Sequence, residues 1–202
     1  MHSNPRGSIS HPSLSLLDRI FLSCNPFGFS SFPCVASDQA TCHKLDSMPD
    51  PLLIESATLD DLPQLADLLY DLFSQEADFI PNRDKQNRGL RLILEQPSRG
   101  RIFVLRNGAR IIGMINLLIT ISTAEGGFVL ILEDLVIHCD HRSQGYGGRL
   151  LDHALDYGRK KGFLRVTLLT DKLENKARSF YEHHGFEQSG MVPMRYYFTK
   201  HE

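Results

Sequence analysis

Residues 141–151, HRSQGYGGRLL, combine an arginine with three closely spaced glycines in a pattern that could bind an anion. The stretch follows the apolar run FVLILEDLVI and precedes residues with helical spacing, so the glycines stand where a strand turns into a helix. Glycine in a helix is less favourable than alanine by roughly 1 kcal/mol, which indicates that bare backbone is needed there. Free N–H groups and the helix dipole at such a corner favour a negatively charged ligand, most naturally phosphate.

Two common phosphate-binding loops do not fit this stretch. A P-loop ends in Gly-Lys-Ser/Thr, whereas Gly148 is followed by Arg149 and Leu150. The dinucleotide fingerprint G-x-G-x-x-G would need a third glycine where Leu150 stands. The pattern present is R-x-x-G-x-G, from Arg142 to Gly147. Tight packing at a strand–helix corner is the alternative explanation for the glycines.

A second segment, NKARSFYEHHGF at residues 175–186, follows after one intervening apolar stretch. The two segments, in this order, resemble the GNAT superfamily of N-acetyltransferases. The resemblance implies that the glycine loop binds the pyrophosphate of acetyl-coenzyme A, the expected co-substrate, through backbone amides. The implied cofactor-binding residues are Leu135, Val136 and Ile137 on the strand, Arg142, Ser143, Gln144, Gly145, Tyr146, Gly147 and Gly148 in the loop, and Asn175 beyond it.

The same resemblance implies a catalytic role for Tyr181, whose hydroxyl would meet the departing sulfur. An ordinary tyrosine has a pKa near 10 and an ordinary thiol one near 8.5, so complete proton transfer would be uphill by roughly 2 kcal/mol. For the general base we select Glu133. Because side chains alternate along a strand, Glu133 and Asp134 are expected on opposite faces. An ion pair with a basic neighbour is the alternative role for either acid.

The elements that must position these residues can be predicted from periodicity. Strands are expected at 52–58, 101–106, 111–122, 128–137 and 165–170, and two closing strands at FEQSG (186–190) and MRYYFT (194–199). Helices are expected at 58–73, at 83–96, after the glycine corner with an apolar face over 150–158 and an end at Gly162, and at 175–184 before Gly185. The order predicts an α/β fold of the GNAT type. Its sheet would be mixed and mostly antiparallel, with a central β-α-β crossover and helices on both faces.

Bulk composition restricts the function classes. The chain has 202 residues and a formal net charge of −2, which argues against a nucleic-acid-binding surface. No run approaches the roughly 20 apolar residues of a membrane span. We therefore expect a cytoplasmic location. The sequence HCDH at 138–141 lacks a second ligand pair, so no metal site is expected.

Residues 1–47 lack periodicity and are predicted to be a disordered leader or the product of a start site assigned too early, with Met48 beginning the acetyltransferase domain, 48–202. Cys24, Cys34 and Cys42 in this segment have no metal-like pair spacing. The predicted function is transfer of an acetyl group from acetyl-coenzyme A to an amine of a small molecule or peptide. A non-catalytic cofactor sensor or docking module is the alternative. Longer acyl chains, an oxygen acceptor and a homodimer stay open.

Overall fold

The computed structural model describes residues 51–75, 80–170 and 175–198, with the side chain of Asn175 excepted. The predicted leader and its three cysteines therefore lie outside the described residues. The strands are β1 (Leu52–Ser56), β2 (Gly100–Asn107), β3 (Arg110–Ser122), β4 (Gly127–Ile137) and β5 (Val166–Leu168). The α-helices are α2 (Leu62–Phe73), α3 (Arg83–Leu94), α4 (Tyr146–Lys161) and α5 (Asn175–His183). Two 3-10 turns, η1 (Leu59–Asp61) and η2 (Cys139–His141), complete this part of the chain.

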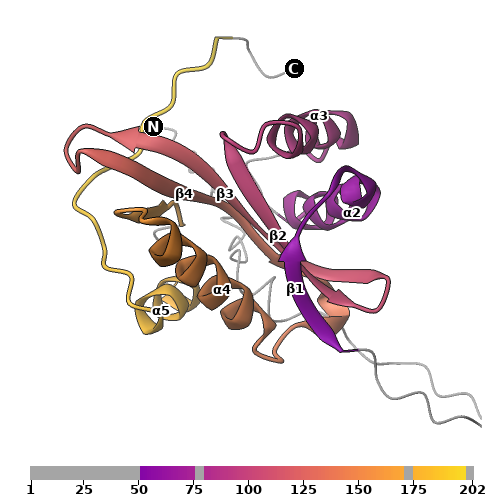
Figure 1. Ribbon diagram of the computed structural model, residues 1–202. Coiled ribbons are helices and arrows are strands. Elements are labelled where there is room, and N and C mark those ends of the chain that lie inside the picture. Colours follow the sequence, from indigo (N-terminus) through magenta and orange to yellow (C-terminus); the bar gives the residue numbers. More distant parts are fainter. Residues whose placement is uncertain (1–50, 76–79, 171–174, 199–202) are drawn as a thin grey trace, which may run out of the picture.

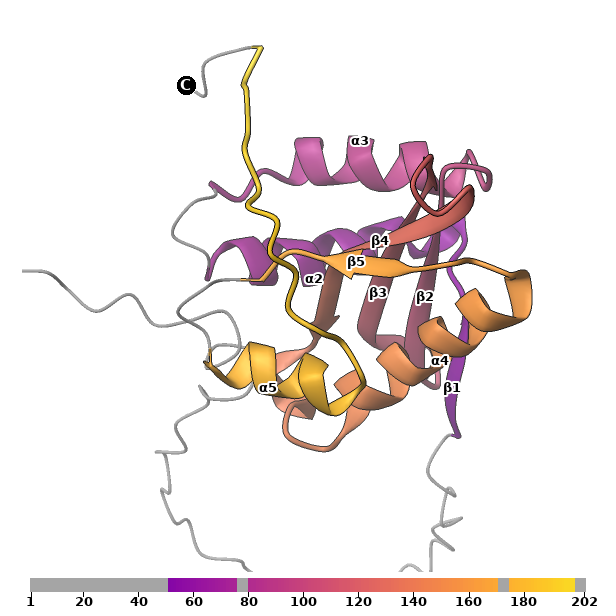
Figure 2. The ribbon, with the colours of Figure 1, turned by 90° about the vertical axis from the view of Figure 1, so that its left-hand side faces the viewer.

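The sheet has the strand order β1-β2-β3-β4-β5, which is also the chain order. The first four strands pair antiparallel, and β5 pairs parallel to β4 through the crossover helix α4. Helices α2 and α3 cover one face, and α4 and α5 cover the other (Figure 1; Figure 2). The predicted fold class, with its central β-α-β crossover and helices on both faces, is thus confirmed.

Each face of the sheet has its own apolar core. On the α2 and α3 side, Leu65 and Leu90 pack with Met114 and Val136. On the α4 and α5 side, buried leucines of α4 pack with residues of β2, β3 and β4 and with Phe180. The alternation of apolar side chains along β3 and β4 supplies both cores.

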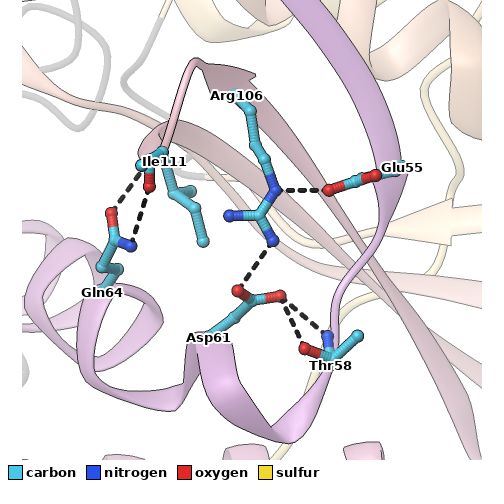
Figure 3. A network of polar contacts seen from close by, with 7 residues as sticks. Glu55, Thr58, Asp61, Gln64, Arg106 and Ile111 are labelled. Atoms are coloured by element: carbon cyan, nitrogen blue, oxygen red, sulfur yellow. Dashed lines mark hydrogen bonds and ion pairs between the residues drawn. The ribbon is translucent and has the colours of Figure 1, made fainter.

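The junction of β1, α2 and β2 is held by a polar network (Figure 3). Asp61 accepts hydrogen bonds from the backbone N–H of Thr58 at 2.8 Å and from the Thr58 hydroxyl at 3.2 Å. Arg106 on β2 donates to Asp61 at 2.7 Å and also to Glu55. The helix predicted from residue 58 therefore begins as a 3-10 turn capped by Thr58, and α-helical geometry starts at Leu62.

The two closing strands predicted from FEQSG and MRYYFT are absent from the described residues 186–198. The side chains of Met194, Tyr196 and Phe198 are largely exposed. Apolar alternation indicates a strand only where a partner ladder and a buried face are available, and β5 is just three residues long. The prediction of these two strands was wrong because local pattern does not supply a partner. In the described part of the chain, no helix is long and apolar enough to cross a membrane.

Candidate active site

The predicted glycine loop forms the N-terminal cap of α4. Gly145 occupies the N-cap position with φ 77°, a left-handed conformation that glycine adopts without strain, and Ser143 has φ 61°. No side chain caps the helix and its first turn holds no acidic residue. Gly145 has no side chain that could accept from the backbone N–H groups of the first turn. Such N–H groups, together with the helix dipole, are able to bind an anion.

Glycine is favoured at positions 147 and 148 of the loop for different structural reasons. A Cβ on Gly148 would lie 3.1 Å from Nε2 of His184, so packing of α4 against α5 favours glycine there. A Cβ on Gly147 would lie 3.8 Å from Phe180 and 3.9 Å from Ile137, which is ordinary contact. Packing alone therefore does not require glycine at 147, and the approach of a ligand to the backbone offers a reason.

Arg142 braces the loop. Its Nε donates to the carbonyl oxygen of Ile137 at 2.9 Å, and its Nη1 donates to Oε1 of Gln75 at 3.4 Å. The half-buried guanidinium thus joins the end of β4 and the turn after α2 to the loop. Gln144 is exposed, and its amide donates to the carbonyl oxygen of Asp140 at 3.5 Å. These contacts fix the loop before any ligand arrives.

A pocket beside this loop joins residues that are far apart in the sequence. Its lining comes from β4, from the loop with the first turn of α4, and from α5. It consists of Leu135, Ile137, His141, Arg142, Ser143, Gly145, Tyr146, Gly147, Phe180 and Tyr181. All but His141 and Phe180 were predicted as site residues. Phe180 was expected in the core, where its ring indeed packs with the α4 cluster.

Strand β4 has a free edge next to this pocket. The parallel ladder with β5 runs from Leu130, paired with Val166, to Leu132, paired with Leu168. Strand β4 continues to Ile137, so in the described residues its last five positions have no neighbouring strand on that side. Backbone groups along this edge are available to an extended ligand. The side chain of Val136 packs in the opposite core, so only its backbone could contribute.

Tyr181 reaches the pocket from α5 between two aromatic rings. Its ring centroid lies 5.1 Å from that of Phe180 and 5.5 Å from that of Phe186. Burial raises the pKa of Tyr181 to about 12. The phenol is therefore neutral at ordinary pH and can serve as a hydrogen-bond donor. Asn175 begins α5, and its side chain lies outside the described residues.

The two acids of β4 lie on the same face of the sheet, contrary to the expected alternation. The register between β3 and β4 shifts so that Asn116 pairs with Asp134 and Leu117 pairs with Leu132, which leaves Glu133 as the extra residue of a bulge. Leu132 packs in the α4-side core and Val136 in the α2-side core. The bulge therefore places both acids on the α2 and α3 side, with Glu133 exposed and Asp134 buried.

Asp134 carries the most perturbed carboxyl of the site. The sequence analysis weighed it beside Glu133 but selected Glu133 as the base. Burial and the charge of Glu133 raise its pKa to about 6, although a 2.9 Å hydrogen bond from the amide of Asn116 lowers it. Asn116 was missed. The sequence did contain a signal for Asn116, because it is a single amide side chain within the apolar run IIGMINLLITI. A buried amide in a strand needs a partner, and here that partner is an acid.

The HCDH segment gathers possible ligand atoms without the surroundings a cation prefers. One atom each of His138, Cys139 and Asp140 lies within 4.8 Å of the others. The guanidinium of Arg110 lies 3.0 Å from Nε2 of His138 and 3.9 Å from the Asp140 carboxylate. Burial and this positive charge lower the pKa of His138. The positive charge of Arg110 beside the cluster disfavours a cation there. The expectation of no metal site stays a prediction.

A mixed sheet with a free β4 edge beside a glycine-rich helix N-terminus defines the class of acetyltransferase-like α/β domains. The chain belongs to the acetyltransferase (GNAT) family, whose model matches residues 62–186. It is 37% identical over 87 residues to the uncharacterized N-acetyltransferase YhfO of Bacillus subtilis (strain 168), a match that covers 43% of this chain and 58% of the relative. The chain thus spans little more than half the length of that relative.

Solved structures share the fold. A possible acetyltransferase from Clostridium difficile 630 superposes with a TM-score of 0.67 at 19% identity, covering 74% of this chain and 99% of that one. An aminoglycoside acetyltransferase from an uncultured soil metagenomic sample, in complex with sisomicin, gives a TM-score of 0.59 at 24% identity and covers 74% and 97%. At these identities the likeness is one of fold.

Proposed function

We propose that this protein transfers an acetyl group from acetyl-coenzyme A to the amine of a small molecule or peptide. The observation that carries the proposal is the pocket in which the α4 N-terminus, the free edge of β4 and Tyr181 meet. Each part matches one need of the reaction: a phosphate site, a backbone edge for an extended arm, and a donor for sulfur. Membership in the acetyltransferase family supports the same reaction.

The residues present fit acetyl-coenzyme A. The N–H groups of Tyr146, Gly147 and Gly148 at the start of α4 would bind the pyrophosphate, and the absence of an acid in that turn avoids repulsion. The space over Gly147, which a Cβ would reduce, allows close backbone approach. Arg142 would hold the loop in shape through its bond to the Ile137 carbonyl. When bound, acetyl-coenzyme A would supply an acetyl group activated as a thioester.

At the reacting end, backbone groups of Leu135 and Val136 on the free edge of β4 would orient the pantetheine arm and polarise the acetyl carbonyl. Tyr181 would donate its O–H to the sulfur. A phenol with a pKa of about 12 lies roughly 3.5 units above a thiol, so complete transfer would be uphill by roughly 5 kcal/mol. Tyr181 therefore acts by hydrogen bonding rather than by releasing its proton. One of the two acids at the β4 bulge would accept the proton of the amine, and the sequence analysis selected Glu133 for this role.

A thiol-release assay tests the proposed function. Purified full-length protein is mixed with acetyl-coenzyme A and, in turn, with sisomicin, a peptide with an N-terminal alanine and a lysine-bearing peptide. Amine-dependent release of thiol is expected with at least one acceptor. Calorimetry with coenzyme A measures binding in parallel. Binding without release on a broad amine panel would favour a cofactor sensor, and absence of binding would contradict the proposal altogether.

A further inference from the structure

The turn that ends α5 carries a histidine that faces both helices of the proposed site. Helices α4 and α5 lie side by side on one face of the sheet (Figure 1; Figure 2). His184 directly follows the last residue of α5, and its side chain is only 14% exposed. Its backbone N–H donates to the carbonyl oxygen of Tyr181 at 3.0 Å. The ring is thus fixed at the end of the helix that carries Tyr181.

The imidazole of His184 makes two contacts with Phe180. Nδ1 lies 2.7 Å from the carbonyl oxygen of Phe180, and because a carbonyl oxygen only accepts, Nδ1 carries the proton. The two rings also pack, with their centroids 4.7 Å apart and their planes tilted by 50°. Phe180 lines the pocket, and its ring centroid lies 5.1 Å from that of Tyr181. His184 therefore contacts the wall of the pocket directly and the Tyr181 ring through Phe180.

The opposite nitrogen of the His184 ring faces α4. A Cβ on Gly148 would lie 3.1 Å from Nε2, which is tighter than ordinary van der Waals contact. Nε2 also lies 3.8 Å from Oδ1 of exposed Asp152, a contact that is an ion pair only when the imidazole is protonated. Gly148 belongs to the first turn of α4, whose N–H groups are proposed to bind the pyrophosphate. One side chain thus extends from that turn to the wall of the pocket that carries the tyrosine.

We propose that His184 is a positioning residue that sets the spacing between Tyr181 and the first turn of α4. This inference rests on the proposed acetyltransferase function. Acetyl-coenzyme A would be held at its pyrophosphate by α4, whereas its sulfur would meet a hydroxyl on α5. The reaction therefore depends on how the two helices are spaced. A misplacement of reacting groups by about 1 Å lowers a rate by up to roughly a hundredfold, so a side chain that fixes this spacing contributes to kcat.

Two substitutions of similar size separate the hydrogen bond of His184 from its packing. In His184→Asn the amide nitrogen stands as many bonds from Cβ as Nδ1 does and keeps the donor to Phe180, whereas His184→Leu removes it. With acetyl-coenzyme A and the best of the three acceptors saturating, His184→Leu should lower kcat about tenfold or more, and His184→Asn less than about threefold. The Kd of coenzyme A should stay within a few-fold in both, because the backbone of the first turn of α4 is unchanged.

The neighbouring histidine supplies a matched control. His183 is the last residue of α5, and its side chain is exposed. His183→Leu should therefore leave kcat unchanged. Equal losses of kcat in His184→Leu and His184→Asn would show that the hydrogen bond has no part in positioning, and an unchanged kcat in His184→Leu would remove the residue from the reaction. Either result would overturn the inference and leave the acetyltransferase function standing.

A substitution on the other helix tests the contact with α4. Gly148→Ala should lower kcat in the wild-type background, because the new Cβ displaces the imidazole. The side chain in His184→Asn is too short to reach the position of Nε2, so there Gly148→Ala should cause no further loss. Such non-additivity is expected when two substitutions act on the same contact. Equal losses from Gly148→Ala in both backgrounds would contradict a spacing role for His184.

A readout on Tyr181 does not require turnover. Its ring signals in proton NMR, identified by their loss in Tyr181→Phe, depend on the neighbouring rings of Phe180 and Phe186. These signals should shift in His184→Leu and keep their wild-type positions in His184→Asn and His183→Leu. Absence of thiol release in wild type would count against the acetyltransferase function. The ring signals would then decide the spacing role alone: a shift confined to His184→Leu would support it, and unshifted signals would overturn it.

Discussion

Arg106 on β2 and Asp61 at the start of α2 are joined by a 2.7 Å ion pair across 45 positions of the sequence (Figure 3). The side chains are 18% and 6% exposed, so the pair is shielded from water. Asp61 also fixes Thr58 at the entrance to the helix. One carboxyl therefore fastens the first strand, the first helix and the second strand together.

Replacing Arg106 should destabilise the fold in a pH-dependent way. Burial opposes ionisation of Asp61, but the hydrogen bonds from Arg106 and Thr58 outweigh it and hold its pKa below the usual value. This stabilisation is present above the unfolded-state pKa of about 3.9 and is lost as pH falls through the lower folded value. Arg106→Met should lower the free energy of unfolding by about 3 kcal/mol at pH 7, and the loss should become smaller as pH falls below about 3.9. Urea unfolding at pH 7 and at pH values below that point measures this difference.

The exposed pair of Arg159 with Asp156 provides the control for that prediction. Arg159→Met should change the free energy of unfolding by less than about 1 kcal/mol, because both side chains face water. Equal losses in the two variants would show that the Arg106 network has no special structural role.

Coenzyme A should stabilise the protein through the α4 loop. At 100 times its dissociation constant, a ligand of the folded state adds about 2.7 kcal/mol, or roughly 5–11 °C in Tm for a domain of this size. Gly147→Val should abolish most of this shift, since its Cβ meets only ordinary contacts in the folded chain and so blocks the ligand rather than the fold. Gly89→Ala on α3, where a Cβ meets nothing within 4 Å, should keep the full shift. Thermal unfolding with and without coenzyme A gives both results.

Removal of the Tyr181 hydroxyl should slow turnover without weakening binding. Tyr181→Phe keeps the ring contacts with Phe180 and Phe186 and deletes the donor. If the hydroxyl meets sulfur only as the thioester bond breaks, kcat should fall roughly ten- to a thousandfold while the Kd of acetyl-coenzyme A stays within a few-fold. Thiol release at saturating cofactor, with calorimetry alongside, measures the two quantities. An unchanged kcat would leave proximity and the β4 backbone to account for catalysis.

A chain that starts at Met48 should retain the folded domain. Residues 1–47 show no periodicity, and the family model matches 62–186. The shortened protein is expected to have the same Tm, within a few degrees, and the same coenzyme A shift as the full chain. A fall of many degrees on shortening would show that the first 47 residues contribute to the stability of the domain.

The sequence by itself determined the glycine loop and the positions of most helices and strands. Periodicity identified α2, α3, α4 and the long strands, and left-handed Gly145 and Gly162 stand at the two ends of α4, where glycine chemistry predicts a turn. These features depend on residues close together in the chain. The pairing of the R-x-x-G-x-G loop with the Tyr181 segment also predicted the family correctly.

Only the tertiary structure decided which side chains share a site. The bulge at Glu133 depends on how β3 aligns with β4, so alternation along one strand gave the wrong face for an acid. Asn116 on β3 and Asp134 on β4 are 18 positions apart in the sequence and meet only in the folded sheet. The burial of the two side chains depends on helices to which neither residue belongs. The prediction of the two closing strands was wrong for the same reason. Strand pairing and burial are set by distant partners, and a local sequence pattern carries no information about them.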